Sequence, residues 1–560
     1  MTRKIIFISL ILVSSINAQQ LTPTQLDSVY NLYTFLLGIN LSNALQSQIE
    51  YNPAIRKCGM SLAQQVKSNF TFFSTEQQKV LLKILQRPSL PNSLVTSNQF
   101  FRIHYTTTGT DAIGYDVNLL AQALDSVYSF EINYLGFPPP PPDGVEGGDD
   151  KYDIYVIDLG NLYGQTWSEN KVGTSRWTTY IEIDNNFPWY SNAVPPKLPI
   201  DAARVTVAHE FHHSIQMGNY APLNGNDPFN SADTYFYELT STSMEEFVFS
   251  TVNDYYGYID DYFNHPERAF ASNNGYDLAI WNIFIKDNFG FGIIKNQWEL
   301  MPTKRAIDAI NTSLLEHQSS FGKELNTFGI WTYYTGYRAK TGYFSEAVNY
   351  PLINSNSFEM NTSVNLPQIK PTSNNHLLTI SPNGQDTLAI ILTNTDYISG
   401  IDNLTKNYNA TYNLYNHNNP GSTKIGESNY FEQLSVDDVS LWLTSVILNG
   451  IVIKRDTMIY VPVASNLDYG YPNPFRYSEG SVINIPVNAP IYSKVDLYIF
   501  STSMNLIFNK NLQVNFGKDN APIISWNLDD VGKKLASGVY IYITKSDKEK
   551  SVGKLVIIND

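Results

Sequence analysis

Apolar residues recur at the spacing of one helix face near the start of this chain. Residues 19–97 are predicted to be mainly helical, with one helix over residues 26–37 opened by Thr22 and another, ending near Leu85, opened by Ser74. Prolines and small polar residues then end the helical pattern. This region is a candidate prosegment, and an ordinary helical subdomain is the alternative.

Two further helices are predicted near the middle of the chain. The first covers residues 199–219, where Pro199 and Asp201 supply start signals and Gly218 supplies a stop. Apolar residues within it recur every three or four positions, as on a helix that buries one face. The second covers residues 235–246.

Strand-like alternation dominates elsewhere. Residues 180–183 are predicted to form an edge strand, to which an extended peptide could add. From residue 349 onward, short alternating segments and polar turns predict a β-sandwich over residues 349–466 and a second one over residues 467–560. We therefore expect an α+β fold class, with a mixed domain at residues 98–348 followed by two β-sandwich domains.

Composition restricts the classes of partner. With 560 residues and 43% hydrophobic content, the chain can bury several cores. Its net charge of -15 argues against nucleic acid and anionic membranes, because both are bound through patches of Lys and Arg. Cys58 is the single cysteine, so no disulfide can form within the chain and stability must come from burial.

The N-terminus has the composition of a signal peptide. Arg3 and Lys4 precede an apolar run over residues 5–13, and Ala18 is a small residue at a suitable cleavage position. The run is far shorter than the roughly 20 residues that cross a bilayer. We expect residues 1–18 to be a signal peptide and the mature protein to be secreted or at the cell surface, without a transmembrane segment.

The segment His209-Glu210-Phe211-His212-His213 carries the strongest chemical signal. It has the HExxH pattern, in which two histidines four positions apart share one helix face and can bind one zinc ion. Glu210 would then lie beside the metal as a general base. His212 lies near the same face, so a pair formed by His209 and His212 is the alternative register.

A zinc hydrolase needs a third protein ligand and an open position for water. On the helix at residues 235–246, Glu238, Thr242 and Glu245 share one face. The segment resembles the ligand helix of the glutamate-ligand zinc peptidases (gluzincins), in which an aromatic-x-x-Glu-x-x-Ala/Ser pattern follows HExxH. This resemblance implies Glu238 as the ligand, with Glu245 and then Glu246 as alternatives. Thr242 stands where many gluzincins have an acidic residue that orients a histidine.

The central region is also similar, over residues 101–337, to a family of secreted bacterial metallopeptidases. The similarity rests on strand-like segments at residues 101–107 and 152–158, and on a helical segment that begins at Tyr276. It implies a zincin-like catalytic domain over residues 98–348, with a mixed sheet in its upper part and helices in its lower part. The implied zinc ligands are the two outer histidines of HExxH and Glu238.

Residues 467–560 resemble the C-terminal sorting domain of the type IX secretion system. The resemblance rests on Tyr471-Pro472-Asn473-Pro474-Phe475, on Trp526 and on a final strand over residues 553–558. It implies that the secretion machinery is a partner. A flagellar-hook-cap immunoglobulin-like module and a plain accessory β-sandwich are the alternatives.

Cys58 lies in Arg56-Lys57-Cys58-Gly59, within the candidate prosegment. This segment resembles the Arg-Cys-Gly core of the cysteine-switch propeptides of other zinc peptidases, with Lys57 in the place of the arginine. The prolines that flank the core in those propeptides are missing, since Met60 follows here. The resemblance implies that Cys58 is an inhibitory zinc ligand from the prosegment; a buried cysteine that only packs is the alternative.

These features predict a secreted zinc metalloendopeptidase, made as a zymogen, that hydrolyses proteins or peptides. Zinc would polarise the scissile carbonyl and activate a water, and Glu210 would move the water's proton to the leaving amine. Tyr276 is a candidate hydrogen-bond donor to the oxyanion, with a role in core packing as the alternative. The alternative function is a cell-surface adhesin or carbohydrate-binding protein with an inert zinc site.

Overall fold

The computed structural model is a mixed α/β protein that divides into two compact units. The first unit comprises Met1–Gly329, Asn354–Leu378 and Ala389–Ile451, and the second comprises Ile330–Ile353, Thr379–Leu388 and Val452–Asp560. The expected signal peptide lies outside the described residues. The structure describes residues 21–40, 42, 45, 53–191, 197–359, 364–366, 370–380, 386–395, 397, 399–400, 408–412, 427–429, 434–436, 446–454, 470–490, 493–502, 505–517, 522–546 and 550–559.

The N-terminal region is helical, as predicted. Thr22 caps α1 and Ser74 caps α4. Each side chain accepts a 3.3 Å hydrogen bond from the backbone N–H three residues later. The predicted starts of both helices are confirmed, and the caps account for them. The helical elements are α1 (Pro23–Leu36), η1 (Pro53–Arg56), α3 (Met60–Ser68), η2 (Phe70–Phe72) and α4 (Thr75–Ile84).

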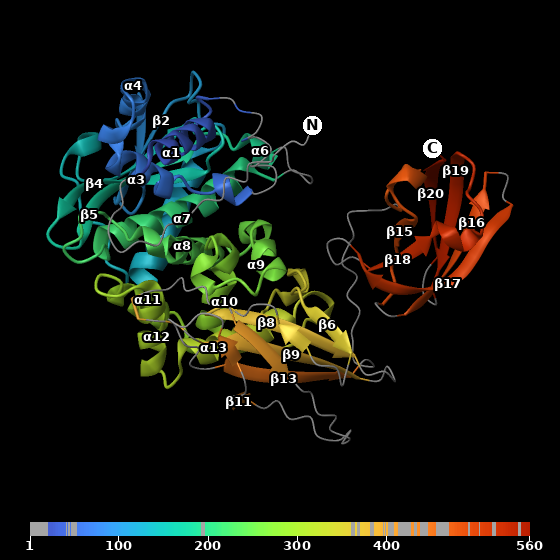
Figure 1. Cartoon of the computed structure of the whole chain (residues 1–560). Coiled ribbons are helices and arrows are strands. Elements are labelled where there is room, and N and C mark those ends of the chain that lie inside the picture. The colour runs from blue at the N-terminus through green and yellow to red at the C-terminus, as the bar shows by residue number, and fades with distance from the viewer. Residues whose placement is uncertain are drawn as a thin grey trace. The chain divides into compact units, whose positions relative to one another are not determined.

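A five-stranded mixed sheet follows, in the order β1-β2-β3-β5-β4 (Figure 1). The predicted edge position of residues 180–183 is wrong, because β5 pairs with β3 on one side and with β4 on the other. β4 is therefore an edge strand of this sheet. The strands are β1 (Asn92–Val95), β2 (Phe101–Tyr105), β3 (Tyr152–Ile157), β4 (Gly164–Val172) and β5 (Arg176–Asp184). β1 pairs antiparallel with β2, so the sheet begins before the expected boundary at residue 97.

Helices cover both faces of this sheet. Successive side chains of a strand point to opposite faces, so Tyr152 and Tyr155 of β3 contact different helices. On one face, Tyr155 and Tyr180 share an apolar core with the N-terminal helices. On the other face, Tyr152 packs edge-to-face against Phe211 of the long helix α7, with ring centroids 5.8 Å apart. The candidate prosegment thus shares a hydrophobic core with the sheet.

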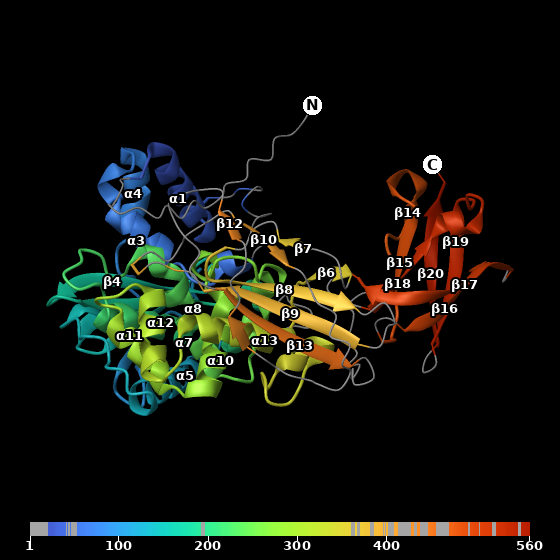
Figure 2. The ribbon, with the colours of Figure 1, turned by 60° about the horizontal axis from the view of Figure 1, so that its bottom comes forward.

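The first unit also contains a helical region, in which α7 packs against both the sheet and α8 (Figures 1 and 2). The two helices predicted from the sequence correspond to α7 and α8. The elements of this part and of the segment after it are α5 (Val117–Tyr128), the π-helical η3 (Ser129–Tyr134), η4 (Glu146–Gly148), α6 (Pro188–Ser191), α7 (Pro199–Asn219), η5 (Ser231–Asp233), α8 (Thr234–Val248), η6 (Asp254–Gly257), α9 (Asp260–Asn264), η7 (Phe270–Ser272), η8 (Tyr276–Leu278), α10 (Ala279–Phe289), α11 (Gly292–Leu300), α12 (Ala306–Glu316), α13 (Phe321–Tyr333), η9 (Gly336–Arg338) and η10 (Ala347–Asn349).

The rest of the described chain is rich in strands, as the alternation predicted. Two sheets form between residues 356 and 454, in the orders β12-β10-β7 and β11-β13-β9-β8-β6. Their strands are β6 (Asn356–Glu359), β7 (Val364–Leu366), β8 (Ser373–Ile380), β9 (Asp386–Asn394), β10 (Tyr408–Tyr412), β11 (Glu427–Asn429), β12 (Leu434–Val436) and β13 (Val446–Lys454).

The C-terminal strands form a seven-stranded sheet in the order β14-β20-β19-β16-β17-β18-β15. Alternate residues of these strands, with Trp526 fully buried among them, make a core that also takes in Tyr337 and Leu352. The elements are β14 (Phe475–Arg476), η12 (Tyr477–Glu479), β15 (Val482–Pro486), β16 (Lys494–Ser501), β17 (Leu506–Phe516), β18 (Pro522–Asn527), η14 (Leu528–Val531), β19 (Gly538–Lys545) and β20 (Lys550–Ile558). Among the described residues, no helix combines the length and the apolar character needed to cross a bilayer.

Candidate metal centre

Four side chains from three parts of the first unit meet at one point. α7 supplies His209 and His213, α8 supplies Glu238, and the N-terminal region supplies Cys58; one potential ligand atom from each lies within 4.8 Å of all the others. The two imidazole Nε2 atoms are 3.0 Å apart, and a Glu238 oxygen lies 3.1 Å from one and 3.3 Å from the other. All four residues are buried, so this set of nitrogen, oxygen and sulfur atoms could hold a metal ion.

The outer nitrogen of each histidine has its own partner. Glu245 accepts a 2.8 Å hydrogen bond from His209 Nδ1, and the Gln216 side-chain oxygen lies 2.7 Å from His213 Nδ1. Partners of this kind fix the orientation of a metal-binding imidazole and leave its inner nitrogen facing the ion. Glu245, an alternative ligand in the sequence analysis, contacts the outer nitrogen of His209, and both Glu245 and the half-buried Glu246 lie outside the cluster.

His212 belongs to a different contact. Its Nδ1 lies 2.7 Å from a carboxylate oxygen of Glu131 in η3, and both side chains are fully buried. Burial lowers the pKa of His212 well below its usual value, and the other two imidazoles add to this effect. His212, the alternative partner of His209 in the sequence analysis, is therefore not part of the cluster of candidate ligands.

Glu210 lies beside the cluster without being part of it. The hydroxyl of Thr166, on β4, donates a 2.7 Å hydrogen bond to one oxygen of the Glu210 carboxylate. Burial raises the pKa of Glu210 above its usual value, against the effect of His209 and His213. A carboxylate whose pKa is shifted towards neutrality is suited to accept and return a proton.

Charges within the cluster are strongly coupled. Burial disfavours a charged imidazole, but the carboxylates of Glu238 and Glu245 raise the pKa of His209 above its usual value. Burial also opposes ionisation of Glu238, yet the two imidazoles lower its pKa. The charged forms of His209 and Glu238 thus stabilise each other.

Cys58 reaches the cluster because its segment pairs with the end of the edge strand. The backbone of Cys58 forms a parallel bridge with Gly164, the first residue of β4, and Gly59 N–H donates to Gly164 O at 2.9 Å. Gly164 itself packs against α7, since a Cβ there would lie 3.0 Å from the Glu210 side chain. Burial raises the pKa of the Cys58 thiol well above its usual value, and Glu210 and Glu238 raise it further.

Tyr276 closes one side of the cluster. Its ring stacks on that of His209, with centroids 5.9 Å apart and an angle of 18° between the planes. Burial raises the pKa of Tyr276 well above its usual value, and the Glu238 carboxylate adds to the shift, so the phenol stays protonated. It is thus a hydrogen-bond donor next to the candidate ligands.

The sequence did not predict the contacts that three residues make around the cluster: Gln216 with His213, Thr166 with Glu210, and Lys57 with Asp254. Gln216 lies one helix turn after His213, so helix spacing could have indicated its role. Thr166 and Lys57 give no such signal, because Thr166 is 44 positions from its partner Glu210, and Lys57 is 197 positions from its partner Asp254.

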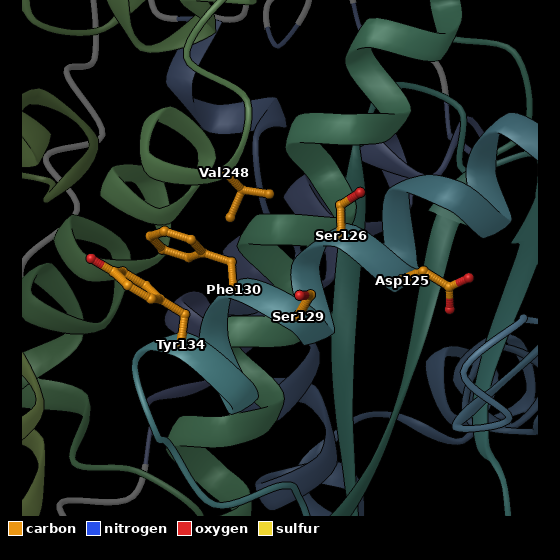
Figure 3. A pocket seen from close by; sticks show the side chains of 6 residues that line it. All are labelled: Asp125, Ser126, Ser129, Phe130, Tyr134 and Val248. Atoms are coloured by element: carbon orange, nitrogen blue, oxygen red, sulfur yellow. The ribbon is translucent and has the colours of Figure 1, made fainter.

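A separate shallow surface pocket contains none of these residues (Figure 3). In the close view Phe130 lies between Val248 and Tyr134. The carboxylate of Asp125 is already used, since it accepts hydrogen bonds from the backbone N–H groups of Ser97 and Asn98. The lining residues are Asp125, Ser126, Ser129, Phe130, Tyr134 and Val248.

Comparisons with known proteins give no family for this chain. No family model matches it, and no curated protein does. A pullulanase structure from Anoxybacillus sp. LM18-11 is 7% identical over 30% of this chain and 26% of the pullulanase chain, with a TM-score of 0.12. The neural ectodermal development factor IMP-L2 is 9% identical over 37% of this chain and 90% of that chain, with a TM-score of 0.09. Neither similarity bears on fold or function at such TM-scores.

Proposed function

We propose that this chain is a secreted zinc-dependent endopeptidase of the zincin type. The observation that carries the proposal is the convergence of His209, His213 and Glu238 around one point, with Glu210 directly beside them. Zinc is the metal that best fits the donors, because it accepts imidazole nitrogen, carboxylate oxygen and thiolate sulfur in four-coordinate sites. Three such ligands leave one position open, as a catalytic zinc site requires.

The neighbouring side chains support hydrolysis by an activated water. A bound zinc ion would lower the pKa of a water and polarise the scissile carbonyl. Glu210, whose carboxylate accepts a hydrogen bond from the Thr166 hydroxyl, would take a proton from that water and return it to the leaving amine. The Tyr276 phenol, which is protonated and stacks on His209, would donate a hydrogen bond to the oxygen on which negative charge develops.

We also propose that the full chain is a latent form. Cys58 lies at the candidate metal position together with the three ligands, and a thiolate there would fill the place needed by the water. The segment that carries Cys58 pairs with the edge strand at Gly164, where an extended substrate could add. Both features support inhibition of the active site by the N-terminal region.

Zinc content tests the ligand assignment. In a Cys58→Ser background, which removes the competing thiol, Glu238→Ala is expected to lose most of the zinc because only two ligands remain. Glu245→Gln is expected to keep zinc with an affinity about 10–100-fold lower, as for other partners of metal-bound histidines. The measurement is zinc per folded molecule after dialysis against a chelator series, with Glu299→Gln as a surface control. Zinc retained by Glu238→Ala and lost by Glu245→Gln would reverse the assignment.

The C-terminal region is proposed to act in export as a type IX sorting domain. Its strands form most of the core of the second unit, to which Tyr337 and Leu352 also belong, and every candidate site residue belongs to the first unit. Deletion of residues 468–560 is therefore expected to block surface delivery or release while zinc-dependent peptidase activity persists in cell extracts. Fractionation combined with an activity assay measures both. Normal export of the shortened chain would contradict the sorting role.

A further inference from the structure

The side chain next to Cys58 fills a closed acidic pocket. Lys57 is fully buried, and its ammonium group lies 2.7 Å from Asp254 Oδ2 and 2.8 Å from Glu245 Oε2. The ammonium also lies 4.5 Å from the centre of the Tyr163 ring and 5.6 Å from that of Tyr258. Two carboxylates and two aromatic faces therefore surround one cation, an arrangement that suits an alkylammonium group.

The walls of this pocket come from the region that carries the metal cluster. Tyr163 immediately precedes β4, Glu245 lies on α8, and Asp254 and Tyr258 belong to η6 and the residue after it. The pocket also touches the cluster, because the other Glu245 oxygen accepts the hydrogen bond from His209. The Glu245 carboxylate therefore contacts both the cation in the pocket and the candidate metal ligand His209.

The backbone around Lys57 follows the edge of the sheet as an added peptide would. Tyr163 N–H donates to Arg56 O, and Gly59 N–H donates to Gly164 O, both at 2.9 Å. The fit at Gly59 is close, since a Cβ there would lie 2.6 Å from Gln165 Oε1. Consecutive residues thus place Lys57 in the acidic pocket and Cys58 at the candidate metal position.

We propose that Lys57 stands in for a substrate side chain, and that this pocket selects a lysine next to the scissile bond. The inference rests on the proposed peptidase function and specifies its substrate class. When the N-terminal segment leaves, Asp254 Oδ2 and Glu245 Oε2 lose their buried cation. A substrate with a neutral side chain would leave this charge unpaired, whereas a lysine would restore both ion pairs.

Lys197 does not replace Lys57 in this role. Its ammonium lies 3.9 Å from the other Asp254 oxygen, and its side chain is 46% exposed. A distant, solvent-screened cation leaves the inner oxygens of the pocket available to a substrate.

Substrate digestion is the first test. The active, processed enzyme is given a peptide library and then matched peptides with lysine or norleucine beside the cleaved bond. We expect lysine to be enriched at one flanking position, with a lysine-to-norleucine ratio of kcat/KM of about tenfold or more. Asp254→Asn should lower this ratio, whereas Asp150→Asn, at an exposed position, should keep it. Cleavage without a basic preference would overturn the inference and leave the peptidase proposal standing; no cleavage of any peptide would overturn both.

A binding measurement tests the pocket without catalysis. Full-length Lys57→Ala leaves the two carboxylates without their cation, so its melting temperature should fall. n-Butylammonium chloride should restore part of this loss, and equal concentrations of sodium chloride or n-butanol should not. The Lys57→Ala/Asp254→Asn chain should show no such rescue. Equal responses to n-butylammonium in the single and double variants would contradict an alkylammonium-binding pocket.

Discussion

Glu210→Gln is expected to lower kcat/KM for peptide hydrolysis by about 10²–10⁴-fold, the usual contribution of a general base. Glutamine has the shape of glutamate, and its amide oxygen can still accept the hydrogen bond that Thr166 donates to Glu210. It cannot accept a proton from water. Because Glu210 is outside the cluster of candidate ligands, the zinc content should stay unchanged. Steady-state kinetics on a quenched peptide, together with zinc analysis, measures both effects.

Glu131→Gln provides the matched control for this substitution. Glu131 is also a fully buried glutamate, but it pairs with His212 and takes no part in the metal cluster. Its variant should keep the turnover per folded molecule even if the protein melts at a lower temperature. Turnover retained in Glu210→Gln would refute the general-base mechanism, and zinc loss in that variant would give Glu210 a ligand role instead.

Local rules account for the parts of the site that the sequence predicted. The positions of His209 and His213 follow from helix geometry, because residues four apart share a face of α7 whatever surrounds it. The starts of α1 and α4 follow from Thr22 and Ser74, whose side chains bond backbone N–H groups only three residues away. Each of these predictions depends on contacts within one element.

Contacts between distant elements account for what could not be predicted. Glu238 and Glu245 are seven positions apart on one face of α8, so only the packing of α8 against α7 decides which one faces the cluster. The position of β5 inside the sheet depends on β4 returning antiparallel beside it, although β4 carries a polar second half with little alternation. Contacts between distant elements therefore decide which carboxylate lies in the cluster and which strand lies at the edge of the sheet.

The uncleaved chain with Cys58→Ser is expected to hydrolyse peptides about tenfold or more faster than the uncleaved parent. Serine leaves the segment in place, where Lys57 keeps its ion pairs, but it removes the thiol from the candidate metal position. Each loss of about 1.4 kcal/mol from the closed state raises the open fraction about tenfold. The hydroxyl is a far weaker zinc ligand than a thiolate, so the closed state should lose at least that much.

The assay compares uncleaved Cys58→Ser, the uncleaved parent and Ser61→Ala, which changes the same segment away from the candidate metal position. Gel analysis at the end of each assay verifies that the chain has stayed intact. After the segment is removed, the variant and the parent should show the same peptide specificity, because Cys58 is then absent from both active sites. Equal activity of the intact parent and the intact Cys58→Ser chain would mean that the thiol does not maintain latency. In that case Lys57, through its contacts with Asp254 and Glu245, would be the remaining candidate for holding the segment against the end of β4.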